Sequence, residues 1–289
     1  MMVELDIERG KCRIEGKEYP MVGLGTYRLT GEICAKALIE AANIGYRIID
    51  TATYYNNFEG MAQGLKKLDR SQLYIISKVW HDMQAKENLR KDLQETQQLL
   101  QTDYLDAYLL HWPNSQIPIK ETLTAMRGLV QEKKVRHIGL SNVTVNHLKK
   151  ALEVGVSITW IQVEMHPYFY DKELLAFCKE CKIGIQAWRP LNLGRMNEDE
   201  VLIEMGKKHG KTACQIALRW IVQHGCIPLP GSKDARHMQE NLNVMDFVLS
   251  TEEMHTLDQR AVTGSRYRLD KARVGFTDEF DFSYEECWP

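Results

Sequence analysis

The stretch Tyr46-Arg47-Ile48-Ile49-Asp50-Thr51-Ala52-Thr53-Tyr54-Tyr55 joins an apolar run of β type to a carboxylate, with a phenol five residues later. Where a strand of a parallel sheet ends, its last side chains face the crevice in which α/β proteins bind ligands. The next two strand-like runs along the chain carry Lys78 and His111 close to their ends. Three successive strand ends therefore offer Asp50 and Tyr55, then Lys78, then His111.

Strand-like and helix-like segments alternate along the rest of the chain, which predicts a parallel sheet built of βαβ units. Eight such units with no low-complexity linker between them predict an α/β fold, a closed (β/α)₈ TIM barrel, as one domain over residues 1–289. Residues 3–23 read as short strands separated by turns at Gly10 and Gly16, which predicts an N-terminal hairpin. Near the other end of the sequence, a capping box at Ser250 predicts the start of a last helix. The expected strands are 21–27, 46–50, 73–79, 105–111, 135–140, 158–165, 183–188 and 226–230, and the expected helices are 31–43, 57–68, 86–100, 119–132, 145–154, 171–182, 198–209, 212–224 and 235–241.

The composition argues against several classes of protein. The 289 residues hold 37 Lys and Arg against 39 Asp and Glu, a formal net charge of −2. A chain this close to neutral lacks the broad basic surface that attracts nucleic acid or anionic membrane. Its apolar runs fall short of the ~20 residues of a transmembrane helix, and residues 1–9 lack the order and apolar core of a signal peptide. We therefore expect a cytoplasmic protein with a small-molecule ligand.

Seven cysteines in a chain of this length indicate reduced thiols packed in a core. Cys178 and Cys181 form a CxxC pair, but the pair falls late in an expected helix. Redox pairs need a helix N-terminus, and zinc sites need four ligands at suitable spacing. We therefore expect no metal site there.

The four residue types at the strand ends suit the reduction of a carbonyl group. Hydride addition leaves an alkoxide, which needs a proton donor within hydrogen-bond reach. Tyr55 is the expected donor, although a free phenol, with a pKa near ~10, is a weak acid at neutral pH. We expect the Lys78 ammonium to lower the pKa of Tyr55, with Asp50 holding Lys78 charged. Neutral His111 would orient the carbonyl, and the hydride must come from a cofactor.

Other interpretations remain open at this point. An isolated Asp–Lys pair is more often a structural ion pair, and a single histidine after an apolar strand is more often a satisfied interior side chain. A glycoside hydrolase using Asp50 and Glu164 would leave Lys78 and Tyr55 unexplained, and a lysine beside an acid keeps that acid ionised. A catalytically idle barrel that binds a cofactor and acts as a regulatory or structural subunit is a further alternative.

Several separate motifs, from about residue 20 to 255, resemble the aldo-keto reductase family in order and spacing. The Gly23-Leu24-Gly25 pair alone would be weak evidence for a nucleotide site. The motifs are Gly23-Leu24-Gly25-Thr26-Tyr27, Asp50-Thr51-Ala52 with Tyr55 and Asn57, Ser77-Lys78 with Trp80, Leu110-His111-Trp112-Pro113, Gly139-Leu140-Ser141-Asn142, Gln162-Val163-Glu164 with His166-Pro167-Tyr168, and Glu240-Asn241.

The resemblance implies a monomeric (β/α)₈ barrel whose N-terminal hairpin closes the bottom. It also implies a nicotinamide cofactor bound without a Rossmann fold, and NADP(H)-dependent reduction of aldehydes or ketones to alcohols. By this resemblance Tyr55 is the proton donor, and Asp50, Lys78 and His111 complete a catalytic tetrad.

The resemblance further implies binding residues around the tetrad. Ser141, Asn142 and Gln162 would hold the carboxamide of the cofactor, and Trp188 would stack on its nicotinamide ring. The apolar substrate pocket is expected to be lined by Tyr27, Trp80, His111 and Trp112. The expected cofactor-binding residues are Thr26, Tyr27, Asp50, Ser141, Asn142, Gln162, Trp188, Arg189, Pro190, Leu191, Ser232, Lys233, His237, Glu240 and Asn241.

The chain departs from the family pattern mainly around the cofactor. Many members have a lysine in place of Gly231 and an arginine in place of His237, both of which would grip the 2′-phosphate of NADP. Ser232, Lys233 and Arg236 could take over this role, so we expect NADPH rather than NADH, with NAD(H) as the alternative.

Two further departures concern single positions. Arg189 stands where a serine is usual, and a guanidinium can grip phosphate oxygens in a bidentate manner. We therefore predict that it contacts the cofactor, the alternative being a solvated loop charge. Phe58 stands where a glutamate is common, and we have no explanation for it.

A C-terminal tail over residues 264–289 carries Arg266, Tyr267, Arg268 and Phe276, which would reach the pocket mouth or pack outside it.

Overall fold

The computed structural model describes residues 3–114 and 116–261. Most of the C-terminal tail expected to reach the pocket mouth, with Arg266, Tyr267, Arg268 and Phe276, therefore lies outside the described residues.

Eight parallel strands form one sheet in the order β11-β10-β9-β8-β7-β6-β5-β4. The main-chain N–H groups of Gly23 and Gly25 donate to the carbonyl oxygens of Pro228 and Pro230, each at 3.0 Å, and so join the first strand to the last. The sheet closes on itself, and the predicted (β/α)₈ barrel is confirmed. The strands are β4 (Leu24–Gly25), β5 (Ile48–Asp50), β6 (Tyr74–Val79), β7 (Leu105–Leu110), β8 (Val135–Ser141), β9 (Trp160–Glu164), β10 (Gly184–Trp188) and β11 (Cys226–Pro228).

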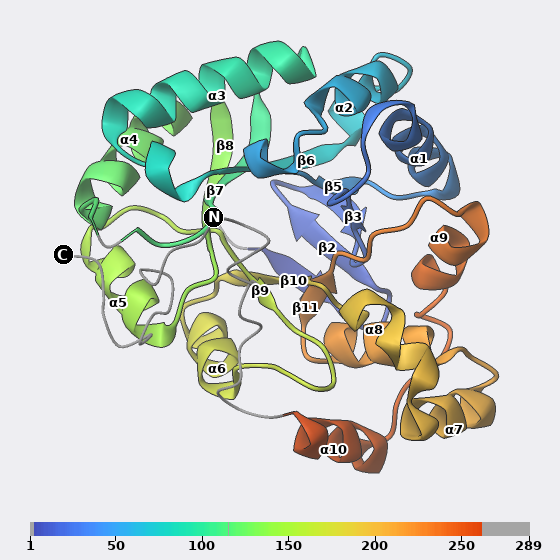
Figure 1. Ribbon diagram of the computed structural model, residues 1–289. Helices are drawn as coiled ribbons and strands as arrows, with labels where there is room; N and C mark the ends of the chain where they lie inside the picture. Colours follow the sequence, from blue (N-terminus) through green and yellow to red (C-terminus); the bar gives the residue numbers. More distant parts are fainter. Residues whose placement is uncertain (1–2, 115, 262–289) are drawn as a thin grey trace.

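The helices form a ring around these strands, in which α1 and α9 are neighbours (Figure 1). The contact between α1 and α9 closes the outer ring as the β4–β11 contact closes the sheet. The helices are α1 (Gly31–Ile44), α2 (Phe58–Leu65), α3 (Lys86–Leu100), α4 (Ile119–Gln131), α5 (Val145–Glu153), α6 (Lys172–Glu180), α7 (Glu200–His209), α8 (Ala213–Gln223), α9 (Ala235–Leu242) and α10 (Thr251–Arg260), with short 3₁₀ turns η1 (Thr53–Tyr55), η2 (Arg70–Gln72), η3 (His81–Met83) and η4 (Asn192–Glu198).

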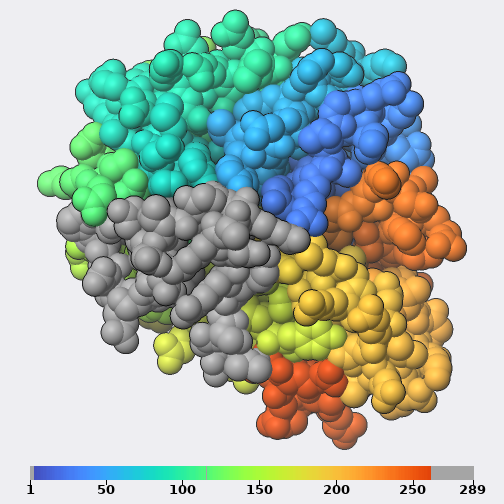
Figure 2. Space-filling model, in the orientation of Figure 1, coloured from blue at the N-terminus to red at the C-terminus, as the bar shows by residue number. Residues whose placement is uncertain are grey.

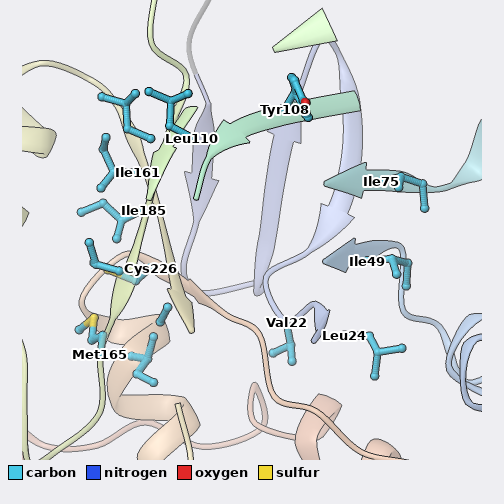
Figure 3. Packing of buried hydrophobic residues seen from close by; sticks show 14 of the residues in the cluster. Val22, Leu24, Ile49, Ile75, Tyr108, Leu110, Ile161, Met165, Ile185 and Cys226 are labelled. Carbon is cyan, nitrogen blue, oxygen red and sulfur yellow. The ribbon is translucent and has the colours of Figure 1, made fainter. Parts of the chain in front are cut away.

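Alternation along each strand divides the core into two layers, because successive side chains of a strand point to opposite faces. Outward side chains such as Ile49, Ile75 and Leu110 pack with the helices in one large buried cluster (Figure 3). Inward side chains such as Ile76 and Leu109 belong to a second cluster inside the barrel. Asp50, Lys78 and His111 continue this inward set at two-residue spacing.

The N-terminal segment closes one end of the barrel. It forms a three-stranded antiparallel sheet of β1 (Glu4–Asp6), β2 (Lys11–Ile14) and β3 (Lys17–Pro20), in agreement with the short strands and the turns expected at Gly10 and Gly16. Cys12 and Tyr19 are buried in the same cluster as the inward side chains of the barrel strands. Since the sheet plugs this end, the opposite end, where the strands terminate, is left for ligands.

Most expected boundaries lie within two or three residues of the observed ones. The first strand is the main exception: only Leu24–Gly25 pairs as a strand of the expected 21–27. The N–H of Met21 instead donates to the carbonyl of Gly10, in the turn before β2, at 2.8 Å. The capping box expected at Ser250 is confirmed, since its hydroxyl accepts from the N–H of Glu253 at 3.2 Å.

Membrane-spanning helices, cysteines and metal-binding groups were sought among the described residues. Among the described helices, none is both long and apolar enough to cross a bilayer. The six cysteines within residues 3–114 and 116–261 are free thiols, including Cys178 and Cys181 near the end of α6. Within those same residues, His, Cys, Asp and Glu side chains form no group suited to a metal ion.

Candidate active site

The four expected catalytic residues come from three neighbouring strand ends. Asp50 is the last residue of β5, Lys78 is the penultimate residue of β6, and His111 follows β7 directly. Tyr55 ends η1, the turn that follows β5. Because β5, β6 and β7 are adjacent and parallel, the four side chains reach the same edge of the sheet.

Lys78 is the centre of this group. Its ammonium lies 2.8 and 2.9 Å from the two carboxylate oxygens of Asp50 and donates to the Tyr55 hydroxyl at 3.0 Å. The His111 ring lies edge-on to the Tyr55 ring, with 5.7 Å between centroids. The structure therefore brings together the phenol, the ammonium, the carboxylate and the imidazole.

Burial controls the protonation of these groups. Burial raises the pKa of the Tyr55 phenol well above 10, and the nearby Asp50 carboxylate adds to the effect. This direction is opposite to the one expected from Lys78 alone, because Asp50 balances the ammonium and desolvation outweighs the remaining attraction. The resting phenol is consequently protonated, the state that a proton donor needs.

The two nitrogen bases respond to the same desolvation. Burial lowers the pKa of Lys78, and the Asp50 carboxylate opposes this shift. Burial, followed by the charge of Lys78, lowers the pKa of His111 well below 6.5, so the imidazole is neutral at pH 7 as expected. Its Nδ1 atom is buried and has no hydrogen-bond partner within the described residues.

A second polar group lies at the ends of β8, β9 and β10. The Trp188 indole donates to Asn142 Oδ1 at 2.9 Å, and Asn142 Nδ2 donates to the His111 carbonyl at 2.8 Å. Asn142 has a left-handed backbone with φ 59°. Gln162 Nε2 donates to Asp50 Oδ1 at 2.8 Å, and Ser141 Oγ donates to the Gln162 carbonyl at 2.8 Å. Four of the expected cofactor residues thus form one network with the Asp50 carboxylate and the backbone of His111.

Aromatic side chains surround His111. Trp80 lies edge-on to the imidazole at 5.0 Å between centroids, and Tyr27, 47% exposed, contacts Tyr55 with ring centroids 5.1 Å apart. Tyr54 stacks flat on Trp80 at 4.1 Å between centroids. Sequence reasoning missed Tyr54, although an aromatic residue next to Tyr55 at a strand end was a usable signal. Trp112 is buried next to His111 in the sequence.

The loop after β10 holds Arg189, Pro190 and Leu191. The Arg189 side chain is only 13% exposed, and its Nη1 lies 3.7 Å from Glu164 Oε1. The alternative of a solvated loop charge is therefore wrong. Glu164 Oε1 is also 3.2 Å from His166 Nε2, so this carboxylate contacts both Arg189 and His166.

Hydroxyl and basic groups gather at the start of α9. Ser232, Lys233 and His237 precede or begin this helix, and Asp234 caps it by accepting from the His237 N–H at 3.0 Å. At Gly231 a Cβ atom would lie 3.1 Å from the Gly25 carbonyl oxygen. The tight approach of the two strand ends thus favours glycine where many family members have lysine. Figure 2 shows the orange surface of α9 beside the blue surface of the N-terminal third of the chain.

Three other expected cofactor residues have roles within the protein. The Thr26 hydroxyl donates to the Asp50 carbonyl at 2.8 Å. Asn241 is buried beside the Tyr46 hydroxyl, and the Glu240 carbonyl accepts from Gln215 at 3.0 Å. The Thr26 side chain thus holds the strand end, and the Asn241 side chain and the Glu240 main chain hold the α9 helix in place.

The sequence and the fold were compared with known proteins. The profile of the Aldo/keto reductase family matches residues 21–261. The chain is 38% identical over 247 residues to the glyoxal reductase of Bacillus subtilis, covering 84% of this chain and 89% of that protein. It is 36% identical over 249 residues to the methylglyoxal reductase DkgA of Salmonella typhimurium, covering 83% and 89%.

A solved structure agrees with this relationship. The aldose reductase of Schistosoma japonicum superposes with a TM-score of 0.84 at 30% identity, covering 94% of this chain and 97% of that one. A family match over most of the chain, together with relatives above 30% identity, establishes that this protein is a carbonyl oxidoreductase of the aldo/keto reductase family.

Proposed function

We propose that the protein reduces aldehydes or ketones to alcohols with NADPH, using Tyr55 as the proton donor. The observation that carries this proposal is the position of the Lys78 ammonium, which contacts the Asp50 carboxylate and the Tyr55 hydroxyl at the same time. This geometry suits a step in which a neutral phenol loses its proton. It has no evident use in hydrolysis by two carboxylates.

Each residue of the tetrad has a separate task. Tyr55 gives its proton to the carbonyl oxygen as negative charge develops there. The Lys78 ammonium, 3.0 Å away, then stabilises the tyrosinate, and Asp50 keeps Lys78 charged against desolvation. Neutral His111 donates a hydrogen bond to the same oxygen and so fixes the direction of the carbonyl.

The residues around the tetrad fit a nicotinamide cofactor, which supplies the hydride when bound. The network of Asn142, Gln162 and Ser141 presents amide and hydroxyl groups suited to a carboxamide. The half-buried Trp188 ring is held by its bond to Asn142 and offers a face for stacking. Arg189, beside Glu164, is proposed to contact the pyrophosphate.

We assign NADPH over NADH because of the groups at the start of α9. Lys233 and Arg236 are exposed there, and the Ser232 hydroxyl lies in the same turn. Two cations and a hydroxyl can bind a 2′-phosphate without the lysine that many family members carry in place of Gly231. Replacing Lys233 by Ala should lower the ratio of kcat/KM for NADPH to that for NADH, by about tenfold for the loss of one charge-assisted contact.

The same proposal includes a monomeric enzyme acting in the cytoplasm as a single domain. The free cysteines of the described residues fit a reducing compartment. Light scattering on the purified protein measures its mass directly, and the mass of a dimer would refute the proposed monomer.

Turnover of a panel of aldehydes tests the function. The protein is mixed with NADPH and with 4-nitrobenzaldehyde or methylglyoxal, and the oxidation of NADPH is followed. Tyr55→Phe should bind NADPH as tightly as the unchanged protein and lose turnover, because it removes only the donated proton. Retained activity in this variant would exclude Tyr55 as the donor.

Tyr104→Phe is the matched control. Tyr104 precedes β7, and its ring packs on Arg70 and Arg136, away from the tetrad. This variant should turn over normally. Tight NADPH binding without turnover of any aldehyde by the unchanged protein would favour the alternative, an idle barrel serving as a regulatory or structural subunit.

A further inference from the structure

A buried carboxyl group lies behind the active-site turn. Asp92 is on α3 between Leu89 and Leu93, on the face that packs against the barrel, and it is 3% exposed. Its carboxyl group accepts from the Tyr108 hydroxyl of β7 and lies 3.1 Å from the hydroxyl of Thr53. It therefore joins a helix, a barrel strand and the turn that carries Tyr55.

Thr53 links this carboxyl group to the catalytic residues. The N–H of Thr51 donates to the Ile76 carbonyl at 2.8 Å, as the last main-chain bond between these strand ends. Two residues further along each of the two segments, the Thr53 hydroxyl donates to the Lys78 carbonyl at 3.1 Å. This side-chain bond takes the place of a main-chain N–H bond. Thr53 is the first residue of the 3₁₀ turn that ends at Tyr55. The side chain of Thr53 thus fixes the backbone of both partners in the Lys78–Tyr55 contact.

The number of protons available for these hydrogen bonds favours the protonated form of the Asp92 carboxyl group. The Thr53 hydroxyl carries one proton and contacts two acceptors, the Lys78 carbonyl and Asp92. An ionised Asp92 only accepts, so one of these two contacts would lack a proton. A protonated Asp92 donates to Thr53, Thr53 donates to Lys78, and Tyr108 donates to the other carboxyl oxygen. This arrangement gives each of these three contacts its own proton, and leaves without one only the longer contact of 3.3 Å between Thr53 Oγ1 and Asp92 Oδ1, the oxygen that accepts from Tyr108.

The surroundings of Asp92 agree with the neutral form. Burial raises its pKa, the hydrogen bonds from Tyr108 and Thr53 oppose this shift, and the carboxylates of Glu95 and Asp82 add to the increase. A neutral carboxyl group also avoids placing an uncompensated charge inside the protein.

We propose that Asp92 is a positioning residue of the reductase, held as a neutral carboxylic acid that donates to Thr53 and so fixes Tyr55 relative to Lys78. The proposal rests on the proposed roles of these two residues in carbonyl reduction. Asp92 does not touch the reacting atoms, and its effect is transmitted by one hydrogen-bonded chain from α3 through η1 to the end of β6.

Two substitutions of Asp92 separate positioning from charge. In Asp92→Asn, the amide copies the neutral acid, because its oxygen accepts from Tyr108 and its nitrogen donates to Thr53. We expect its kcat to stay within about threefold of the unchanged enzyme. Asp92→Ala leaves Thr53 without this partner and should lower kcat by about ten- to a hundredfold, with the Kd for NADPH unchanged. Glu87→Gln, an exposed change on the same helix, is the matched control and should leave kcat unaltered.

Three kinetic results would overturn the proposal. An unaltered kcat in Asp92→Ala would show that no positioning occurs. A loss in Asp92→Asn as large as in Asp92→Ala would show that the ionised carboxylate is required. If Asp92→Ala does not fold, Thr53→Val breaks the same chain at a partly exposed residue, and an unchanged kcat there has the same meaning.

Infrared spectroscopy provides a measurement that is independent of turnover. The protonated carboxyl group should give a carboxylic-acid C=O stretching band at pH 7 that is missing in Asp92→Asn. Absence of this band from the unchanged protein would refute the neutral acid. If the unchanged protein shows the band but reduces no carbonyl substrate, the proposed function fails while the protonation state of Asp92 stands.

Discussion

Removal of the Asp50 carboxylate should destabilise the protein strongly, because it leaves the Lys78 ammonium buried without a counter-charge. The side chains of Lys78 and Asp50 are 0% and 4% exposed, and their charged atoms are 2.8 Å apart. At an effective dielectric constant of about 20, charges at this distance attract by about 6 kcal/mol. Part of this gain offsets desolvation, so Asp50→Asn should lower the free energy of unfolding by about 3–5 kcal/mol at pH 7.

The penalty should depend on pH in a defined direction. Burial lowers the pKa of Lys78, and Asp50 is the group that raises it. Without Asp50 the folded-state pKa falls further below that of unfolded lysine, about 10.4. Between these two values the unfolded chain binds more protons, so the stability of the variant rises with pH. The difference from the unchanged protein should shrink as the pH is raised above 7.

Urea denaturation of a double-mutant cycle measures the coupling. Asp50→Asn and Lys78→Met are compared alone and together, at pH 7 and at pH 9. The double variant should be less destabilised than the sum of the single ones, by about 2 kcal/mol or more, because it contains neither unpaired charge. If the two effects add within about 0.5 kcal/mol, the pair is not coupled and the reasoning fails.

Three further predictions concern the cofactor network, the histidine and the last helix. Trp188→Phe removes the N–H that donates to Asn142 and should weaken NADPH binding about fivefold, measured by fluorescence titration, whereas an unchanged Kd would contradict the network. Burial lowers the pKa of His111 well below 6.5, so the ring should show no NMR titration between pH 6 and 8. The neutral ring should also contribute to the free energy of unfolding above pH 6.5, and this contribution should be lost as the pH falls below 6.5. Ser250→Ala removes the cap that receives the Glu253 N–H and should cost about 1 kcal/mol in urea denaturation, and a change near zero would show that α10 does not unfold with the barrel.

Helix α3 shows what the sequence pattern predicts and what it does not. Its bounds, Lys86–Leu100, equal the predicted ones, because Leu89, Leu93 and Leu100 recur at helical spacing and are all buried. The same pattern did not identify Asp92, a polar residue on this buried face. Its meaning depends on Tyr108 and Thr53, which come from other elements and were not paired with it by any local signal.

The candidate active site also has features that the sequence pattern predicts and others that it does not. The convergence of Asp50, Tyr55, Lys78 and His111 could be predicted because inward side chains recur every two residues, and strand ends of a parallel barrel meet at one edge. The stacking of Tyr54 on Trp80 and the pairing of Arg189 with Glu164 could not be predicted, since both join separate loops.

By itself, the order of apolar and polar residues determined the eight βα units, the barrel and the identity of the four groups at its mouth, because these depend on periodicity along the chain. The tertiary structure alone decided the direction in which the pKa of Tyr55 shifts. The pKa of Tyr55 rises rather than falls because desolvation, which only the folded chain imposes, outweighs the attraction of Lys78 that the sequence suggested.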